Sequence, residues 1–168
     1  MNRTLYNHFI DFKQAFDSVL QEGLWKTMRH CGVPEELVVL IEDIYGKSRN
    51  AVRVEGELTD WFQIKVGVRQ GCGMSADLFI LILEIVMRLA ERKGEEVGVM
   101  ITEMTLNNLR FADDIDLIAD TEVNLQHLTD RVDGSNRRMG LRINTGKTKT
   151  MTIGKSTRIY RYNWEERY

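Results

Sequence analysis

Apolar residues recur along this chain with two different periods, which predicts a mixture of helices and strands. A spacing of three to four residues between apolar positions is typical of helices. It covers residues 21–29, a stretch that opens at Pro34, residues 75–91 and residues 122–138. Alternation of apolar and polar residues is typical of strands. It covers residues 5–10, 105–111, 115–119 and 147–153, together with a hairpin inside residues 49–66.

Residues with special backbone preferences mark several of the expected boundaries. Gly32 and Gly140 stand just after predicted helices, where a glycine commonly ends the last turn. Ser75 stands where an N-cap is expected, because its hydroxyl can accept a hydrogen bond from the first helical turn. Three glycines between residues 67 and 73 predict a loop whose backbone closely approaches another group.

The order of these elements predicts the fold class. Strand, helix, hairpin, helix and strand follow one another, which favours an α+β fold with an antiparallel sheet and helices on one face. The hairpin inside residues 49–66 and the two helices before it are additions to that layer. With 168 residues, 43% of them hydrophobic, the chain is long enough for a single domain with its own core.

Three carboxylates stand at the ends of predicted strands. Asp113 and Asp114 are adjacent in the turn between residues 105–111 and 115–119, and Asp11 follows strand 5–10. If these strands are neighbours, the carboxylates converge on a site of hard oxygen ligands, which Mg²⁺ prefers. Two-metal phosphoryl or nucleotidyl transfer needs such a site. A solvated acidic turn is the alternative.

Charge is distributed unevenly along the chain. Residues 1–130 hold 13 Lys and Arg against 22 Asp and Glu, whereas residues 131–168 hold 10 against 3. The basic end is either a surface for phosphates or a solvated, poorly ordered tail, which we place at residues 154–168. Because the net charge of the whole chain is −2, strong autonomous binding of nucleic acid is not expected.

The two cysteines and the length of the apolar runs argue against a disulfide framework, a zinc site and a membrane span. Cys31 and Cys72 are far apart, so neither a disulfide framework nor a zinc site is indicated. The longest apolar run, around residues 78–87, is much shorter than the ~20 residues of a membrane span. We therefore expect an intracellular protein, cytoplasmic or nuclear, without a membrane partner.

Four stretches, in order, resemble the palm of a reverse transcriptase, and they are most similar to enzymes of LINE-type, non-LTR retrotransposons. They are Phe9-Ile10-Asp11-Phe12-Lys13-Gln14-Ala15-Phe16-Asp17-Ser18, Gly67-Val68-Arg69-Gln70-Gly71-Cys72, Phe111-Ala112-Asp113-Asp114, and Gly140-Leu141-Arg142-Ile143-Asn144 through Lys147-Thr148. The resemblance covers roughly residues 5–151 and implies a polymerase palm with a ferredoxin-like antiparallel sheet. The corresponding palm-like domain is expected at residues 1–153.

The resemblance also implies roles for individual residues. Asp11 and Asp113 would be metal ligands with Asp114 as a weaker partner, and Lys147 would protonate the leaving pyrophosphate. Two Mg²⁺ ions are implied, for which Mn²⁺ can substitute. Phe16 would screen the sugar 2′ position of the incoming nucleotide. The other nucleotide-binding positions implied are Phe12, Gln14, Ala15, Gln70 and Gly71.

By this resemblance the chain is an RNA-directed DNA polymerase that uses an RNA template, a DNA primer and dNTPs. The family pattern Pro-Leu-Ser-Pro is replaced here by Gly73-Met74-Ser75-Ala76, which leaves a looser loop. Counterparts of the fingers and thumb are not recognisable, so little activity is expected from the chain alone. Two alternatives remain open: a catalytically inactive, transposon-derived folded module, and a nucleotidyl cyclase on the same palm architecture.

Overall fold

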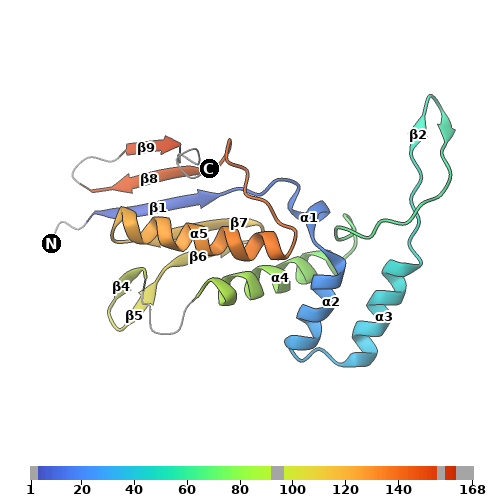
Figure 1. The fold of residues 1–168 in the computed structure, drawn as a ribbon, viewed down its shortest axis with the longest axis horizontal. Coiled ribbons are helices and arrows are strands. Elements are labelled where there is room, and N and C mark those ends of the chain that lie inside the picture. The colour runs from blue at the N-terminus through green and yellow to red at the C-terminus, as the bar shows by residue number, and fades with distance from the viewer. Residues whose placement is uncertain (1–3, 92–96, 155–157, 162–168) are drawn as a thin grey trace.

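A five-stranded antiparallel sheet covered on one face by helices organises the protein (Figure 1). The computed structural model describes residues 4–91, 97–154 and 158–161. The strands lie in the order β6-β7-β1-β8-β9. Their bounds are β6 Asn108–Phe111, β7 Asp114–Ala119, β1 Leu5–Ile10, β8 Lys149–Ile153 and β9 Arg158–Arg161. The chain is therefore an α+β protein, as the order of elements predicts.

Two long helices, α4 (Ser75–Ala90) and α5 (Glu122–Arg138), pack side by side against the sheet. Side chains on the covered face alternate with those on the open face, so Ile10 and Ile115 pair across β1 and β7 and are both buried. Phe79 and Ile82 of α4 are fully buried between the layers. The core therefore lies under β1 and β7, the two strands whose ends carry the candidate carboxylates.

His8 is the one histidine of the described core. It is fully buried on β1, and its Nδ1 lies 2.9 Å from the hydroxyl of Thr150 on β8. Burial disfavours the charged ring and lowers the pKa of His8 to about 4. His8 is therefore a neutral structural residue between the central strands at physiological pH.

Further elements extend this layer. Helices α1 (Ala15–Ser18), α2 (Gln21–His30) and α3 (Glu35–Gly46) follow β1, and Gly32 ends α2 with φ +79° as expected. Strands β2 (Arg53–Val54) and β3 (Glu57–Leu58) form a hairpin that projects from the body (Figure 1). Among the described helices, none is long and apolar enough to cross a membrane.

The structure corrects two predicted stretches of strand. The hairpin in residues 49–66 is paired over only two residues per strand, in β2 and β3. Beyond β3, Trp61 and its neighbours are exposed, and the isolated bridge Asn50–Phe62 connects them to the opposite segment. The predicted strand 105–111 is broken at Asn107, whose carbonyl accepts a hydrogen bond from the amide of Ile118. Its first part, β5 (Met104–Leu106), pairs instead with β4 (Val99–Ile101) in a separate ribbon.

Two smaller predictions are also wrong. Ser75 is the first helical residue and not the N-cap, because its hydroxyl donates to the carbonyl of Arg69. The last predicted strand begins at Lys149, since the amides of Lys147 and Thr148 both donate to the carbonyl of Asn144 and close a turn. Arg158–Arg161 of the basic C-terminal stretch form β9 beside β8, so these four residues belong to the sheet.

Candidate active site

The pairing of β1 with β7 brings the three predicted carboxylates to one edge of the molecule. Ile10 is paired with Ile115 in antiparallel register, so the next position after Ile10, Asp11, lies opposite Asp114. Asp113 precedes Asp114 in the turn between β6 and β7. Convergence of strand ends, which the sequence only suggests, is therefore fixed by the sheet register.

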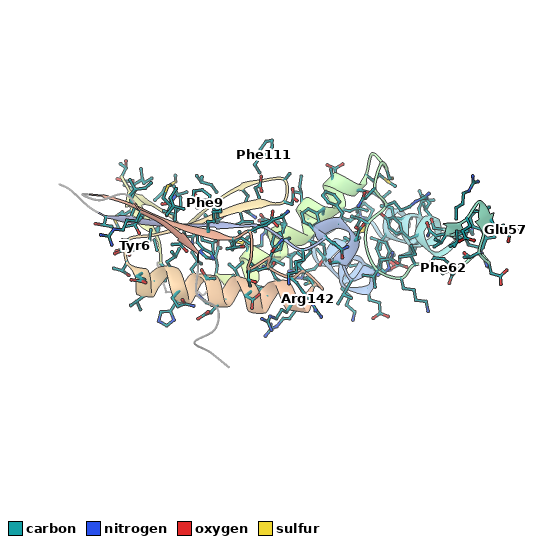
Figure 2. All side chains as sticks on the ribbon, turned by 90° about the horizontal axis from the view of Figure 1, so that it is seen from above. Tyr6, Phe9, Glu57, Phe62, Phe111 and Arg142 are labelled. Atoms are coloured by element: carbon teal, nitrogen blue, oxygen red, sulfur yellow. The ribbon has the colours of Figure 1, made fainter. Side chains whose placement is uncertain are left out.

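Asp11 and Asp114 lie on the open face of the sheet, the face that α5 does not cover. Phe9 and Phe111 project on the side opposite α5, whereas Tyr6 lies on the α5 side (Figure 2). Because side chains alternate along a strand, Asp11 shares the open face with Phe9, and Asp114 shares it with the Phe9 partner Asp116. No helix of the described chain covers this face (Figure 2).

The turn that carries Asp113 has a strained backbone. Phe111 and Asp114 are paired, so only Ala112 and Asp113 connect the two strands. Ala112 has φ +53°, a left-handed conformation that is costly for a residue with a Cβ atom. Such outliers are frequent at functional sites because the surrounding structure holds them for a purpose.

Asp11 has a different environment for each of its carboxylate oxygens. Its Oδ2 lies 3.7 Å from the Nζ of Lys147, whereas its Oδ1 is buried and has no hydrogen-bond partner among the described residues. The backbone of Asp11 is held on both sides, since its carbonyl accepts from Asn144 at 2.7 Å and its amide donates to the Thr148 hydroxyl at 3.3 Å. Asp11 and Lys147, two of the predicted site residues, thus lie next to each other.

The carboxylates fit a divalent cation, although they do not yet surround one. Within the described residues, no three acidic, histidine or cysteine side chains form a metal-binding group as they stand. A buried carboxylate oxygen without a donor, such as Asp11 Oδ1, is nevertheless what a hard cation would satisfy. Asp113 and Asp114 add further oxygen donors next to it in the register.

A fourth carboxylate, Asp116, lies on the same face of β7. Burial raises the pKa of its carboxyl group, while the side-chain amide of Asn7, which donates to Asp116 Oδ2 at 2.9 Å, opposes that rise. Asp116 therefore differs from Asp114, which is exposed at the turn. The sequence analysis did not single out Asp116, since its alternating position is also typical of a solvated strand residue.

The glycine-containing loop docks on the segment around α1. The amides of Gly67 and Val68 donate to the carbonyls of Val19 and Phe16, both at 2.7 Å. A Cβ atom on Gly67 would lie 3.0 Å from the backbone of Asp17, so only glycine allows this approach. The side chain of Gln70 then donates to Asp17 Oδ1 at 2.9 Å. Asp17 is a positioning residue that local sequence patterns did not reveal.

The predicted nucleotide positions after Asp11 differ in exposure. Phe16 is half-buried and stacks on Phe79 of α4, with ring centroids 4.6 Å apart. The side chains of Phe12 and Ala15 are buried, so only their backbone can meet a ligand. Gln14 is exposed and has φ +47° just before α1, a second left-handed residue near the carboxylates.

Comparison with known proteins identifies the family. The sequence model described as "Reverse transcriptase (RNA-dependent DNA polymerase)" matches residues 2–165. The chain belongs to the reverse transcriptase family. The resemblance stated from four sequence motifs is therefore confirmed, and the acidic turn lies in the matched part of this reverse transcriptase chain.

Relatives of this reverse transcriptase come from retrotransposable elements. The retrovirus-related Pol polyprotein of the type-2 element R2DM of Drosophila melanogaster is 30% identical over 151 residues, which are 90% of this chain and 14% of the relative. The corresponding polyprotein of the type-1 element R2 of Bradysia coprophila is 30% identical over 158 residues, 94% of this chain and 18% of the relative. The chain thus spans less than a fifth of the length of these two relatives.

The fold is shared with telomerase. The structure of telomerase from Candida tropicalis in complex with a fragment of telomeric RNA superposes with a TM-score of 0.70 at 19% identity, over 94% of this chain and 27% of that one. At this identity the likeness concerns the fold alone. It confirms the predicted polymerase palm architecture for this member of the reverse transcriptase family.

A contact missed by the sequence analysis fixes the acidic hairpin of the reverse transcriptase chain onto α4. Glu84 Oε2 lies 2.9 Å from Arg110 Nη1 on β6, and Glu84 Oε1 lies 2.7 Å from Arg88 Nε on the same helix. These two hydrogen bonds keep the pKa of Glu84 below its ordinary value. The sequence feature that could have indicated this contact is Glu84 itself, because a single charged residue inside an apolar run needs a charged partner.

Proposed function

We propose that this chain is the palm of an RNA-directed DNA polymerase of a non-LTR retrotransposon and that it supports two-metal nucleotidyl transfer. The observation that carries the proposal is the register of β1 and β7, which places Asp11 opposite Asp114 and beside the Asp113 turn. Membership of the reverse transcriptase family and the R2 relatives support the same activity.

Asp11, Asp113 and Asp114 are the residues that would hold the two Mg²⁺ ions, or Mn²⁺ in their place. When bound, such ions lower the pKa of the primer 3′-hydroxyl and neutralise charge on the phosphates. Asp11 contributes the buried oxygen Oδ1, and its backbone contacts to Asn144 and Thr148 hold it in place. Asp113 presents its carboxylate from a two-residue turn, which limits its freedom.

Lys147 is the proposed proton donor to the leaving pyrophosphate. Its Nζ lies 3.7 Å from Asp11 Oδ2, so the ammonium group is held next to the metal-binding carboxylate. A cation in this place also attracts the phosphates before the proton moves. The exposed position of Lys147 lets the protonated amine be restored from water after each transfer.

The nucleotide would lie against the α1 segment and the docked loop. Phe16 screens the 2′ position of the sugar, and its stacking on Phe79 limits how far the ring can move away. Gln70 and Gly71 border the incoming nucleotide and template, with Gln70 oriented by Asp17. Gln14 and the backbone of Phe12 and Ala15 complete this surface. The polymer partners are an RNA template and a DNA primer, and the small substrates are dNTPs.

Single-nucleotide addition tests this function. The purified chain, in excess over a short DNA primer annealed to RNA, is incubated with Mg²⁺ and the next complementary dNTP. We expect slow addition without processive synthesis, because holding reactants in line supplies ~7–11 kcal/mol of the barrier and the chain covers less than a fifth of its relatives. The addition should disappear in Asp113→Asn and persist in Asp60→Asn, a substitution of an exposed carboxylate beyond β3.

Two results would contradict the proposal. Addition that survives Asp113→Asn would show that this carboxylate does not take part and that another enzyme is present. Complete absence of Asp113-dependent addition at saturating primer-template would favour the alternative of a folded module without catalysis.

A further inference from the structure

A hollow beside the candidate active site lies on the side of the sheet that faces α5. It has a volume of about 950 Å³ and lies between the α1 segment, the C-terminal end of α5 and residues 140–145. Its charged lining residues are Lys13, Asp133, Arg137 and Arg142. Figure 2 places Arg142 beside the end of α5, on the side of the sheet opposite Phe111.

The backbone register places two of these basic residues opposite each other. Phe12 and Ile143 form an antiparallel bridge, and the amide of Lys13 donates to the carbonyl of Arg142 at 2.8 Å. Lys13 and Arg142 are therefore cross-strand neighbours. Like charges directly opposite each other on paired segments destabilise the pairing. On the same two segments Asp11 lies opposite Asn144, so Lys13 and Arg142 lie two positions along the chain from this pair.

The carboxylate available in the hollow does not neutralise this pair. Asp133 Oδ2 lies 2.9 Å from the Nε of Arg137 and is thus engaged on α5. Within the part of the chain that the structure describes, no carboxylate forms an ion pair with Lys13 or Arg142. Among the residues that the structure describes, Lys13 and Arg142 therefore leave two positive charges in the hollow without a carboxylate, which a doubly charged anion would balance.

We infer that this hollow binds adjacent phosphate groups of a small polyphosphate through Lys13 and Arg142, with Arg137 at its rim. Arginine and lysine form strong, charge-assisted hydrogen bonds to phosphate oxygens. The hydroxyl of Thr145 and the side-chain amide of Gln14 line the same hollow and supply uncharged donors. An anion between Lys13 and Arg142 would turn their repulsion into two attractive contacts.

The inference deepens the proposed function and rests on it for the identity of the natural ligand. Nucleotidyl transfer releases pyrophosphate next to Asp11 and Lys147, and the hollow lies on the α5 side of the two segments that carry these residues. A cationic hollow there gives the product anion a place to move to once it leaves the carboxylates. The capacity to bind pyrophosphate can be tested without polymerisation and without a metal.

The experiment measures pyrophosphate binding to the full chain by calorimetry and thermal melting, in EDTA and at constant ionic strength. Pyrophosphate should raise the melting temperature of the wild type, and Arg142→Gln and Lys13→Gln should each weaken binding about tenfold. Both variants should melt at or above the wild-type temperature without the anion, because they remove the repulsion. Arg53→Gln, which removes an exposed cation on β2, should bind as the wild type does.

Two further arms separate this site from its neighbours. Asp113→Asn should still bind pyrophosphate without metal, even if it has lost nucleotide addition, so failure of the proposed function does not imply failure of the hollow. A single-stranded oligonucleotide should bind the wild type and Arg142→Gln equally. The inference would be overturned if pyrophosphate binding were unchanged in Arg142→Gln and Lys13→Gln, were lost equally in Arg53→Gln, or depended on Asp113. It would also be overturned if Arg142→Gln weakened binding of the oligonucleotide but not of pyrophosphate, because the cations would then bind a nucleic-acid backbone.

Discussion

Replacement of Gly140 by alanine should destabilise the fold because this residue joins the end of α5 to the α1 segment. Gly140 has φ +85°, and a Cβ atom there would lie 2.4 Å from the carbonyl oxygen of Ser18 and 2.8 Å from Leu20 Cγ. A left-handed conformation costs alanine about 1–2 kcal/mol, and the forced shift of packed groups adds about 1–3 kcal/mol. We therefore expect Gly140→Ala to lower the free energy of unfolding by about 2–5 kcal/mol.

Gly134 on the same helix is a matched control. It is exposed in the interior of α5, and a Cβ atom there would meet nothing within 4 Å, so Gly134→Ala should stabilise the protein by about 0.5–1 kcal/mol. Urea unfolding followed by circular dichroism measures both changes. A Gly140→Ala variant within about 0.5 kcal/mol of the wild type, the range of ordinary surface substitutions, would refute the packing described for residues 18–20 and 140.

Three further predictions concern other parts of the fold. Because burial lowers the pKa of His8 to about 4 from an ordinary value of 6.5, the unfolded state binds the extra proton first. Stability should thus fall by at most about 1.4 kcal/mol per pH unit as the pH drops from 6 to 4, and urea unfolding of His8→Leu should lack this contribution. Glu84→Gln removes the charge that holds Arg110, so amide hydrogen exchange should accelerate in residues 108–119 while α5 is unaffected. Phe16→Val should lower the preference for dNTPs over rNTPs in single-nucleotide addition. Unchanged discrimination would refute the screening role of Phe16 and show that the ring only packs against Phe79.

The sequence predicts those parts of the fold whose local pattern agrees with their final environment. Ile10 of β1 and Ile115 of β7 are buried between less buried neighbours, and α5 has both its apolar seam and its terminal glycine. The apolar pattern gives a wrong prediction where the apolar side chains are not buried in the folded protein. Trp61 to Val66 alternate like a strand but are exposed, and the apolar Val123 in the first turn of α5 is 64% exposed while Leu125 is buried.

The candidate site was predictable as far as strand ends allow. Carboxylates at the ends of neighbouring strands lie at one edge of the sheet, so the correct strand order was enough to place Asp11 near Asp113 and Asp114. Contacts between distant residues of different elements, such as Asp17 with Gln70 and Glu84 with Arg110, have no local period to reveal them. The like-charged pair of Lys13 and Arg142 appears only when the register of their two segments is known.

Divalent-metal binding by the purified chain tests the central claim most directly. In a thermal melt with millimolar Mn²⁺ or Mg²⁺, an ion bound by the folded chain raises the melting temperature by linkage. We predict this rise for the wild type and for the control Asp60→Asn, and its loss in Asp11→Asn and Asp113→Asn. No rise in the wild type, or an equal rise in Asp113→Asn, would contradict a shared metal site at the meeting point of β1 and β7.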